Sequence, residues 1–424
     1  MSVVRDRRDA KRELRQQDAE ARAEISASYD KEIELAEKDG LDNEVGRLRG
    51  EYRNQLAIWR NQHALEAAAP RTVQADGPSL SEGDVSQLRD LLTSTQGLAS
   101  RTVSAEGHFL RGNAFYEIAD FKSAISEYSE AVHLDPEYAA AYNNRGITYG
   151  YLHQNQQAVE DFDTALKLIP NHPMVYYNRG TSYRLLDQNE RAIEDFDEAI
   201  LLNPTHSEAY NNRSLCYESL GEYERALDDL NLAVRLVPED AEVHFNRGNV
   251  LIGLERYECA IASYDEAIRL TPDYAMAYYN RGNTNAVLAR HESAIEDFDQ
   301  VIRLNPEYAP AYSNRGSARI NLNQHELAIE DFNEAIALDL GVAENFNNRG
   351  IAYATLGEYQ LALKDHDEAI RLNPNYPNAY HNRGVTLKRL AEIAEADFAK
   401  ERKLKIEPND SGDETEESDE NKLS

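Results

Sequence analysis

The sequence has little of what marks secreted and membrane proteins. It contains only two cysteines, Cys216 and Cys259, which are too few for a disulfide framework, so we expect small, partly buried, reduced side chains. No apolar run that resembles a secretory signal follows the first residues, and no stretch approaches the length needed to span a bilayer. These absences predict a cytoplasmic protein.

Basic residues are also scarce. Lys and Arg number 45 against 76 Asp and Glu, which gives a formal net charge of -31. Such an excess of negative charge repels the phosphates of nucleic acids and anionic membrane surfaces. We therefore expect no nucleic acid and no membrane among the partners, and instead a protein or peptide partner.

Signatures of catalysis are missing from the sequence as well. It has no glycine-rich phosphate loop ending in Lys-Ser or Lys-Thr, and no GxGxxG, HExxH, paired CxxC or GxSxG motif. Its Glu-Asp pairs, such as Glu194-Asp195, recur at a fixed interval, which a catalytic carboxylate pair would not do. We expect no enzyme, no cofactor and no metal site.

What the sequence does contain is one motif at a fixed interval. Tyr142-Asn143-Asn144-Arg145-Gly146 returns with small changes every 34 residues, and the same register reaches back to Arg111-Gly112. A period of this length indicates stacked repeats that share one continuous core. The later copies begin at Tyr176, Tyr210, His244, Tyr278, Tyr312, Phe346 and Tyr380.

Each repeat is predicted to hold two helices. Gly146 of the first helix and Ala158 of the second are expected to face each other, because only small side chains let two helix axes approach closely. Phe162 fills the gap around that contact. A turn is expected at residues 154–156, and Pro170 ends the second helix.

Two positions of this pattern carry a family resemblance. The small residue of the second helix recurs at Ala124, Ala158, Ala192, Ala226, Ala260, Ala294, Ala328 and Ala362, and the closing proline at Pro136, Pro170, Pro204, Pro238, Pro272, Pro306, Pro374 and Pro408. The chain thereby resembles a tetratricopeptide repeat (TPR) protein. The resemblance implies an all-α, right-handed superhelical solenoid with a concave groove of first helices and a convex back of second helices. It also implies a protein–protein interaction scaffold that binds an extended peptide or partner segment in the groove.

The composition divides the chain around this array. We assign nine repeats to residues 105–408 and a capping helix to residues 84–104, since the end of an array must be closed off from water. Residues 67–83 contain prolines and small residues and are expected to form a linker. Residues 409–424 cannot bury apolar surface and are expected to form a disordered acidic tail.

Residues 1–66 are rich in strong helix formers, and Lys38-Asp39-Gly40 supplies a turn signal, so we predict a charged helical hairpin. The hairpin packs on itself or on the solenoid, or it self-associates as a short coiled coil through residues 3–68. An alternative function follows from it: a regulatory or substrate-recruiting subunit of an enzyme complex, docked through this hairpin.

Two repeats depart from the pattern. The seventh has Leu340-Gly341 in place of the closing proline, so its turn to the next repeat is expected to differ. The ninth reads Ala394-Glu395-Ala396-Asp397-Phe398, which is two residues out of phase, and Lys400 and Lys403 follow. A basic, polar last helix fits a solvent-facing cap.

A recurring asparagine is the strongest candidate for peptide binding. It stands two residues before the small position of the first helix, on the face expected to line the groove, and its amide both donates and accepts. The resemblance implies that such a ladder holds a peptide backbone, although asparagine is also the common family choice here. The ladder is Asn144, Asn178, Asn212, Asn246, Asn280, Asn314, Asn348 and Asn382.

A recurring arginine follows each of these asparagines, and an acid recurs on the second helix. We predict that each arginine pairs with that acid across the helix packing, where a guanidinium binds a carboxylate bidentately. The fifth repeat has Ser263 in place of the acid, which leaves Arg247 freer. The arginines are Arg111, Arg145, Arg179, Arg213, Arg247, Arg281, Arg315, Arg349 and Arg383.

The sixth and seventh repeats share a polar change. Asn285 and Arg319 replace the usual aromatic residue of the first helix, and His291 and His325 occupy the expected turn. The four residues mark either a weakened packing spot or a polar sub-site in the groove.

The acids are expected mostly on the convex back, at Glu160, Glu194, Asp228, Glu296 and Glu330, which leaves an uncharged groove. Binding there should depend weakly on salt. Beside the ladder we expect the groove to be lined by Asn143, Tyr177, Asn211, Phe245, Tyr279 and Asn347.

Overall fold

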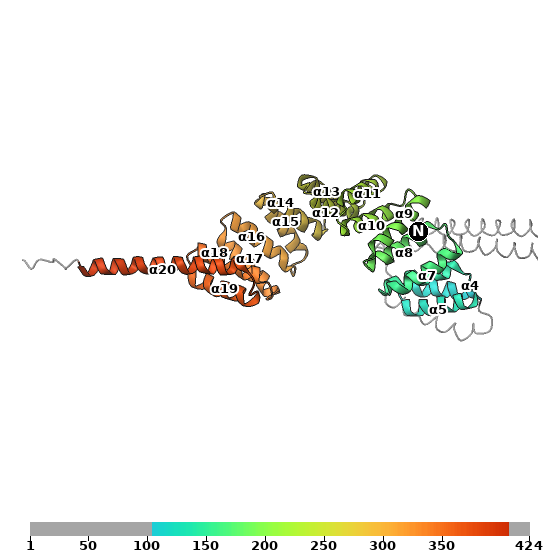
Figure 1. Ribbon diagram of the computed structural model, residues 1–424, viewed down its shortest axis with the longest axis horizontal. Helices are drawn as coiled ribbons and strands as arrows, with labels where there is room; N and C mark the ends of the chain where they lie inside the picture. The colour runs from blue at the N-terminus through green and yellow to red at the C-terminus, as the bar shows by residue number, and fades with distance from the viewer. Residues whose placement is uncertain (1–103, 407–424) are drawn as a thin grey trace, which may run out of the picture. The chain divides into compact units, whose positions relative to one another are not determined.

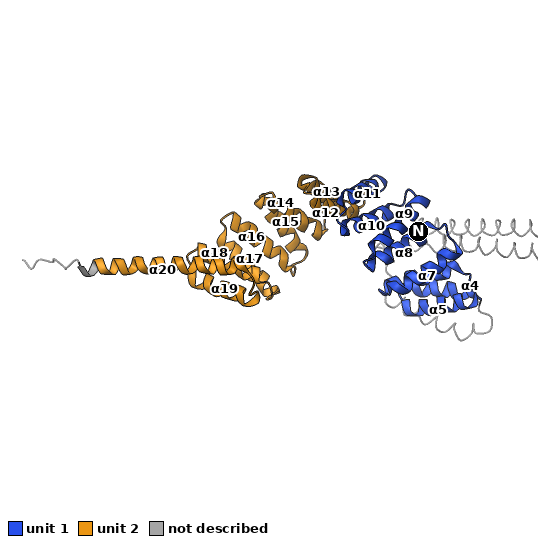
Figure 2. Cartoon of the chain, viewed as in Figure 1, with its two compact units in different colours: residues 1–238 blue, residues 239–424 orange. Residues whose placement is uncertain are grey.

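The computed structural model describes residues 104–406 and shows an all-helical chain in this range (Figure 1). The predicted hairpin, linker, capping helix and acidic tail lie outside the described residues, apart from Ser104. None of the described helices is long and apolar enough to cross a membrane. The chain divides into two compact units, residues 1–238 and 239–424 (Figure 2).

The described part of unit 1 consists of four helix pairs. Each first helix packs against its own second helix, and successive pairs stack. The pairs are α4 (Ala105–Glu117) with α5 (Phe121–Leu134), α6 (Ala139–Tyr151) with α7 (Asn155–Leu168), α8 (Pro173–Leu185) with α9 (Asn189–Leu202), and α10 (Ser207–Ser219) with α11 (Tyr223–Leu236).

The described part of unit 2 consists of four more pairs and a long last helix, α20 (Pro377–Ile406). The pairs are α12 (Ala241–Gly253) with α13 (Tyr257–Leu270), α14 (Ala275–Val287) with α15 (His291–Leu304), α16 (Ala309–Asn321) with α17 (His325–Leu338), and α18 (Ala343–Thr355) with α19 (Tyr359–Leu372).

The turn inside each pair is a Schellman motif that lies earlier than predicted. In α6–α7 the amide of Gln154 donates to the carbonyl of Tyr149 and that of His153 to Gly150, both at 2.9 Å. His153 has a φ of 57°, so the turn spans residues 152–154 and not 154–156. The prediction missed it because this left-handed residue is a glycine in only two of the eight pairs, at Gly221 and Gly357.

An aromatic ring lying on a glycine closes most pairs. A Cβ added to Gly146 would stand 2.8 Å from Cε1 of Phe162, which is fully buried. The contact predicted between Gly146 and Ala158 is therefore a contact between the glycine and the ring. The same arrangement joins Gly112 to Tyr128, Gly180 to Phe196, Gly248 to Tyr264, Gly282 to Phe298, Gly316 to Phe332 and Gly350 to His366.

The predicted ion pairs between the helices of one repeat are confirmed. Arg179 donates through Nε and Nη2 to both carboxylate oxygens of Asp195, at 2.8 and 2.6 Å. Burial alone would lower the pKa of Arg179, but its hydrogen bonds to Asp195 and Asp163 raise that pKa above its ordinary value. The same pairs join Arg111 to Glu127, Arg145 to Asp161, Arg213 to Asp229, Arg281 to Asp297, Arg315 to Asp331 and Arg349 to Asp365.

A second acid, which was not predicted, ties five of the arginines to the preceding repeat, whereas Arg145 bonds there to Ser129 and Arg349 to Asn333. Nη1 of Arg179 donates to Asp163 of the previous second helix at 2.6 Å. This acid follows the first acid by two residues, as in Asp161-Phe162-Asp163, and that spacing is the signal that the prediction overlooked. Further such bonds join Arg213 to Asp197, Arg281 to Asp265, Arg315 to Asp299 and Arg383 to Asp367.

Arg247 has no carboxylate at the position where its counterparts have one. Its Nε donates to the hydroxyl of Ser263 at 3.1 Å, and burial lowers the pKa of the guanidinium. The fifth repeat therefore holds a half-buried arginine charge without the charge compensation of the neighbouring repeats.

The seventh repeat keeps the regular turn even though it lacks proline. Helix α17 ends at Leu338 in the common register, and the amide of Gly341 donates to Oδ1 of Asp339 at 2.8 Å. The amide of Glu307 makes the same local bond with Asn305 in the repeat before, at 3.3 Å. The expectation of a different turn was wrong, because this side-chain bond fixes the turn without proline.

The ninth repeat is not a helix pair. Helix α20 continues through residues 390–392, where the turn would lie, and packs on α19 and α18. At the common spacing of 34 residues, Lys400 stands where the preceding repeat has the ring of His366, and Lys403 stands where it has the buried Ala369. No apolar side chain at these two positions would pack the helix back on the array. The array is thus eight closed pairs followed by one open helix.

Two glycines of helix α6 test the ring contact. Gly146→Ala should destabilise the protein by about 1–3 kcal/mol, because the added methyl group overlaps Phe162. Gly150→Ala should raise stability by up to about 1 kcal/mol, since a Cβ there meets nothing within 4 Å. Urea denaturation midpoints measure both, and equal shifts would contradict the contact.

The ion pairs are tested by exchanging two residues at equivalent positions. Ser263→Asp should stabilise the protein by about 1–3 kcal/mol, because it gives Arg247 a charged acceptor. Asp195→Ser should destabilise it by about 3 kcal/mol, since Arg179 loses its buried partner. A lower Tm for Ser263→Asp in thermal melts would contradict this prediction, because it would show that Arg247 gains nothing from a carboxylate at this position.

Candidate binding surface on the first helices

The ladder asparagines lie on the surface formed by successive first helices, here called the first-helix face. Neighbouring first helices contact each other within each unit, for example α6 with α8 and α14 with α16. The amide Nδ2 groups of at least six of the eight ladder residues bond to the preceding repeat, so much of the ladder already braces the array. Their partners are asparagine oxygens or tyrosine hydroxyls.

In unit 1 the amides form a relay. Asn144 donates to Oδ1 of Asn113 at 2.9 Å, Asn143 to Asn144 at 3.1 Å, and Asn178 to Asn143 at 3.2 Å. Asn212 donates to the hydroxyl of Tyr177 at 3.1 Å. Three successive first helices are therefore linked by side-chain amides alone.

Unit 2 repeats the arrangement. Asn280 and the hydroxyl of Tyr264 both donate to Oδ1 of Asn249, each at 2.9 Å. Asn314 donates to Oδ1 of Asn283 at 2.7 Å and to the hydroxyl of Tyr279 at 3.1 Å. The remaining ladder residues are Asn382, which donates to Asn347, Asn348, which accepts from Asn347, and Asn246, which is buried.

The residues expected to line the groove beside the ladder are partly withdrawn from it. Asn143, Asn211 and Asn347 are only 3%, 8% and 2% exposed. Asn143 and Asn347 each accept a hydrogen bond from the next ladder asparagine. The expectation that these three form the groove lining was wrong, because the side chain at this position packs between adjacent first helices.

One cavity of about 250 Å³ opens on the first-helix face of unit 2. Asn280 and Asn283 supply its polar groups, and the exposed side chain of Val287 and the side chain of Ile252 supply apolar walls. No other described residue hydrogen-bonds Oδ1 of Asn280 or Nδ2 of Asn283. The full lining is Asn249, Ile252, Tyr257, Tyr264, Asn280, Asn283, Thr284 and Val287.

The proposed polar sub-site is not assembled on this face. Asn285 is buried and donates to Asp297 at 3.1 Å, and Arg319 donates to Asp331 at 2.8 Å, so both join the ion pairs between helices. His291 and His325 are the first residues of α15 and α17 and do not lie in the turn. The structure thus uses Asn285 and Arg319 inside the helix pairs, where the aromatic residue of other repeats would pack.

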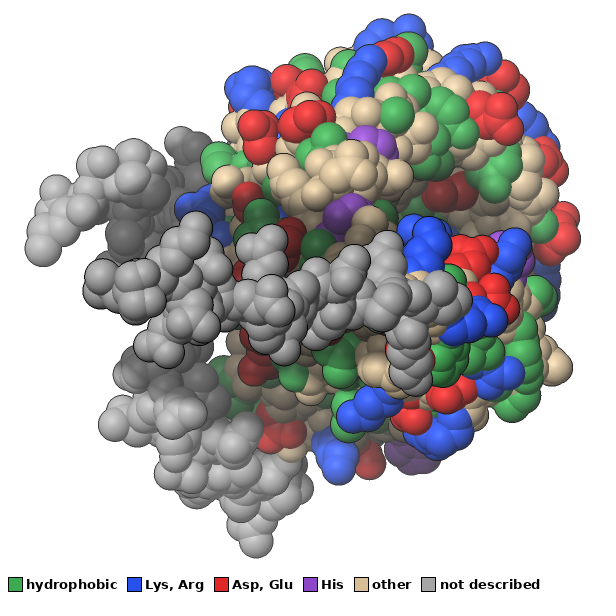
Figure 3. All heavy atoms as spheres, turned by 90° about the vertical axis from the view of Figure 1, so that its left-hand side faces the viewer, with side chains coloured by type: hydrophobic (Ala, Val, Ile, Leu, Met, Phe, Trp, Pro, Cys, Tyr) green, Lys and Arg blue, Asp and Glu red, His purple; other side chains and the backbone are tan. Residues whose placement is uncertain are grey.

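The second helices carry most of the exposed acids. Glu160, Glu194, Asp228, Glu296 and Glu330 are all exposed, as predicted. On the coloured part of the surface seen in Figure 3, Lys and Arg side chains lie next to Asp and Glu.

A cavity of about 530 Å³ in unit 1 mixes both charges. Arg213 and Arg225 line it together with Asp228 and Asp229, and Arg225 lies over the ring of Tyr217 at 4.0 Å from the centroid. Arg213, Arg225 and Asp229 already bond each other or neighbouring side chains, and both charges line the cavity, so it offers no single-sign site.

The described residues contain two free cysteines and no candidate metal-binding cluster. Among residues 104–406 no group of three or more His, Cys, Asp or Glu side chains is placed to hold a metal ion. Cys216 is fully buried, and burial raises its pKa to about 11, so it is unreactive at neutral pH. Cys259 is exposed and free.

Comparison with protein families gives matches along nearly all of the array. Models described as "Tetratricopeptide repeat" match residues 139–172, 173–206, 196–228, 275–308, 309–341, 343–376 and 367–398. A model described as "TPR repeat" matches residues 112–152, 216–254 and 248–286. No curated protein matches the chain.

Solved structures resemble the chain more distantly. YrrB, a TPR protein with an unusual peptide-binding site, is 26% identical, with 45% of this chain and 99% of that chain covered and a TM-score of 0.42. A tetratricopeptide repeat protein from Parabacteroides merdae is 20% identical, with 58% and 98% covered and a TM-score of 0.46. The Cut9–Hcn1 hetero-tetramer of the APC/C is 16% identical, with 78% and 62% covered and a TM-score of 0.45.

Helix α16 offers a matched test of the bracing role. Asn314→Ala removes two bonds to the preceding repeat and should cost about 1–2 kcal/mol of stability. Asn321→Ala removes one exposed bond within the same helix and should change stability by less than about 0.5 kcal/mol. Denaturation midpoints decide, and a neutral Asn314→Ala would show that the ladder does not brace the array.

Proposed function

Because this chain belongs to the tetratricopeptide repeat family, we propose that it is a protein-interaction scaffold that holds an extended partner segment on its first-helix face. The repeats of this family generally serve as non-enzymatic interaction scaffolds. The described residues also lack any cluster that would hold a catalytic metal.

The cavity beside Asn280 and Asn283 carries the proposal. Its volume of about 250 Å³ accommodates one large apolar side chain, and Ile252 and Val287 provide apolar contact. Val287 is 65% exposed, so its side chain is accessible to a partner at the cavity. An apolar residue of a bound segment fits this space.

The amides around the cavity fit a peptide backbone. Oδ1 of Asn280 is an acceptor for a backbone N–H, and Nδ2 of Asn283 is a donor for a backbone carbonyl. Their opposite amide atoms are held by Asn249 and Asn314, which fixes the orientation of both groups. Groups held in place before binding lose little conformational entropy when the peptide arrives.

Among the remaining ladder residues, Asn178, Asn212, Asn314 and Asn382 are proposed to extend this contact within their own units through their oxygens, since the oxygens of Asn144 and Asn348 accept from Asn143 and Asn347. Since their Nδ2 atoms brace the array, replacing Asn246, Asn280 and Asn314 together would disturb folding as well as binding. A variant that leaves the bracing intact is therefore needed to test binding alone.

The alternative role as a regulatory or substrate-recruiting subunit depends on the hairpin at residues 1–66. That segment lies outside the described residues, so the alternative stays a prediction. Copurification of an enzyme that is lost on deleting residues 1–66 would favour it.

Val287→Glu tests the proposed function, because it places a charge in the cavity and breaks none of the hydrogen bonds that brace the repeats. Peptides selected from a random display library on the full-length protein are labelled, and their affinity is measured by fluorescence polarisation. We expect Kd to rise at least about tenfold, or about 1.4 kcal/mol, with an unchanged Tm.

Leu340→Glu is the matched control, since Leu340 is 69% exposed and lies in a connecting turn of the same unit. It should leave Kd unchanged, and binding of the wild type should depend weakly on salt. If the selected peptides bind Val287→Glu as well as the wild type, or bind with a steep salt dependence, the first-helix face is not the binding surface.

A further inference from the structure

The open helix α20 carries a binding position that is filled in the other repeats. A Cβ added to Gly384 would meet nothing within 4 Å, whereas the equivalent Gly350 and Gly316 are covered by a ring. Among the described residues, Arg383 forms its ion pair with Asp367 of the preceding second helix. In the closed pairs of unit 2, a carboxylate bonds the arginine and a ring covers the glycine; in the fifth repeat, Ser263 replaces the carboxylate. Among the described residues, Arg383 and Gly384 have neither a partner of this kind from their own repeat nor a covering ring.

The missing partner would have a defined sequence. In the closed pairs the acid and the ring follow the arginine and the glycine by 16 residues, as Asp331 follows Arg315. In α20 the residues at that distance are Ala399 and Lys400. Neither side chain can reproduce the ion pair or the ring contact.

The required sequence nevertheless occurs nearby in the same helix. Asp397-Phe398 is an acid–ring pair, and Ala394 precedes the ring by four residues, as Ala328 precedes Phe332. This second-helix motif follows Arg383-Gly384 by 14 residues. The segment that would form the turn is therefore two residues too short.

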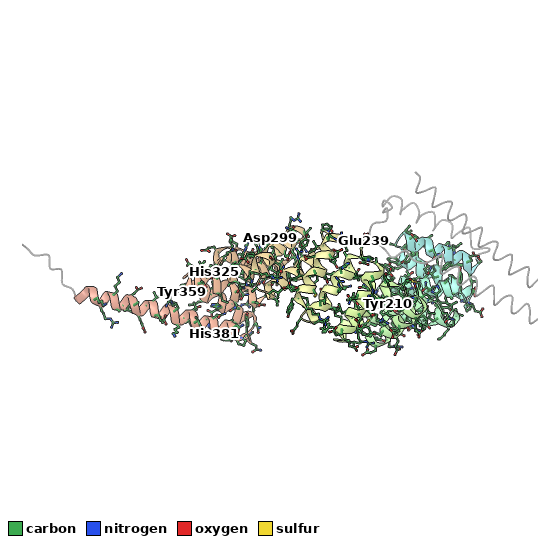
Figure 4. All side chains as sticks on the ribbon, turned by 90° about the horizontal axis from the view of Figure 1, so that it is seen from above. Tyr210, Glu239, Asp299, His325, Tyr359 and His381 are labelled. Carbon is green, nitrogen blue, oxygen red and sulfur yellow. The ribbon has the colours of Figure 1, made fainter. Side chains whose placement is uncertain are left out.

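The shortened segment explains why α20 does not fold back. A Schellman turn needs a left-handed residue after the helix. In the closed pairs three residues form this turn, for example Leu356-Gly357-Glu358, where Gly357 is the left-handed residue. Without those residues the helix continues, and its second half extends past α18 and α19 (Figure 1). Side chains project from this half with no described helix beside it (Figure 4), and Phe398 is 61% exposed.

We propose that this helix pairs with α20 of a second copy of the chain. Asp397 of one copy would pair with Arg383 of the other, and Phe398 would cover Gly384. The contact is reciprocal because each copy carries both the arginine–glycine pair and the acid–ring pair. Short hinges favour such exchange of identical elements, and a two-fold interface satisfies both positions at once.

The register of the exchange follows from the closed pairs. Two antiparallel helices that meet at Gly384 and Phe398 also bring Leu387 opposite Ala394 of the partner copy, one turn further along. Leu387 is 49% exposed, so the pairing covers two large apolar side chains of each copy. Glu401 takes the position that a buried alanine, or Val301, holds in the closed pairs, and its side chain is exposed in α20.

A site-specific disulfide tests the proposal in the full-length chain with Cys216→Ala and Cys259→Ser. Leu387→Cys and Ala394→Cys lie about 10 Å apart along one continuous helix, too far for a bond within one copy. We expect oxidation to give a covalent dimer, at least about tenfold more than for the control pair Arg389→Cys and Ala396→Cys. The control has the same spacing on the opposite side of α20.

A second variant for the cross-linking experiment carries an insertion of Gly-Glu after Leu390. It reproduces Leu220-Gly221-Glu222 and Leu356-Gly357-Glu358 and restores the spacing of 16 residues. The same cysteine pair should then close within one copy, which shifts the product from dimer to monomer on a non-reducing gel. The proposal is overturned if the chain without the insertion gives no cross-link, links within one copy, or links no better than the control.

Discussion

The contact between a buried ring and a glycine decides the architecture of this chain. It brings the two helices of a repeat close enough for an arginine to reach an acid 16 residues away. Where the glycine becomes Ser214, the ring becomes the smaller Leu230, and both are fully buried, so total volume at the crossing is kept. Where the ring is missing, at Gly384, the second helix does not return.

The arginine extends this closure from one repeat to the next. Arg179 bonds to an acid of its own second helix and to an acid of the preceding one, and the ladder amides do the same between first helices. Planar guanidinium groups and amides suit this task because each offers several donors in fixed directions. The surface left for a partner is therefore the set of amide atoms and apolar side chains that this bracing does not use.

The sequence predicted the helix pairs, their register and the ion pairs, because these depend on residues at one fixed spacing. It did not predict the position of the turn, since the left-handed residue is His153 or Asn323 as readily as glycine. It also placed Asn143 and Asn347 in the groove, although they are buried between first helices. Whether an asparagine faces a partner or a neighbouring repeat depends on side-chain packing, which the 34-residue period does not encode.

The cavity beside Val287 was likewise not predicted from the sequence, because its lining combines residues of three helices and depends on how their side chains pack. In contrast, the phase shift of Asp397-Phe398 could be read directly from the repeat, and only its consequence, a continuous helix, required the structure.

Hydrogen exchange measured by mass spectrometry at several protein concentrations tests the central claim most directly. If the ring–glycine contact closes the repeats, the amides of α4 to α19 should exchange slowly at every concentration. Residues 391–406 should exchange quickly in dilute protein and slowly when the protein is concentrated. Protection of residues 391–406 that does not change with concentration would contradict the account.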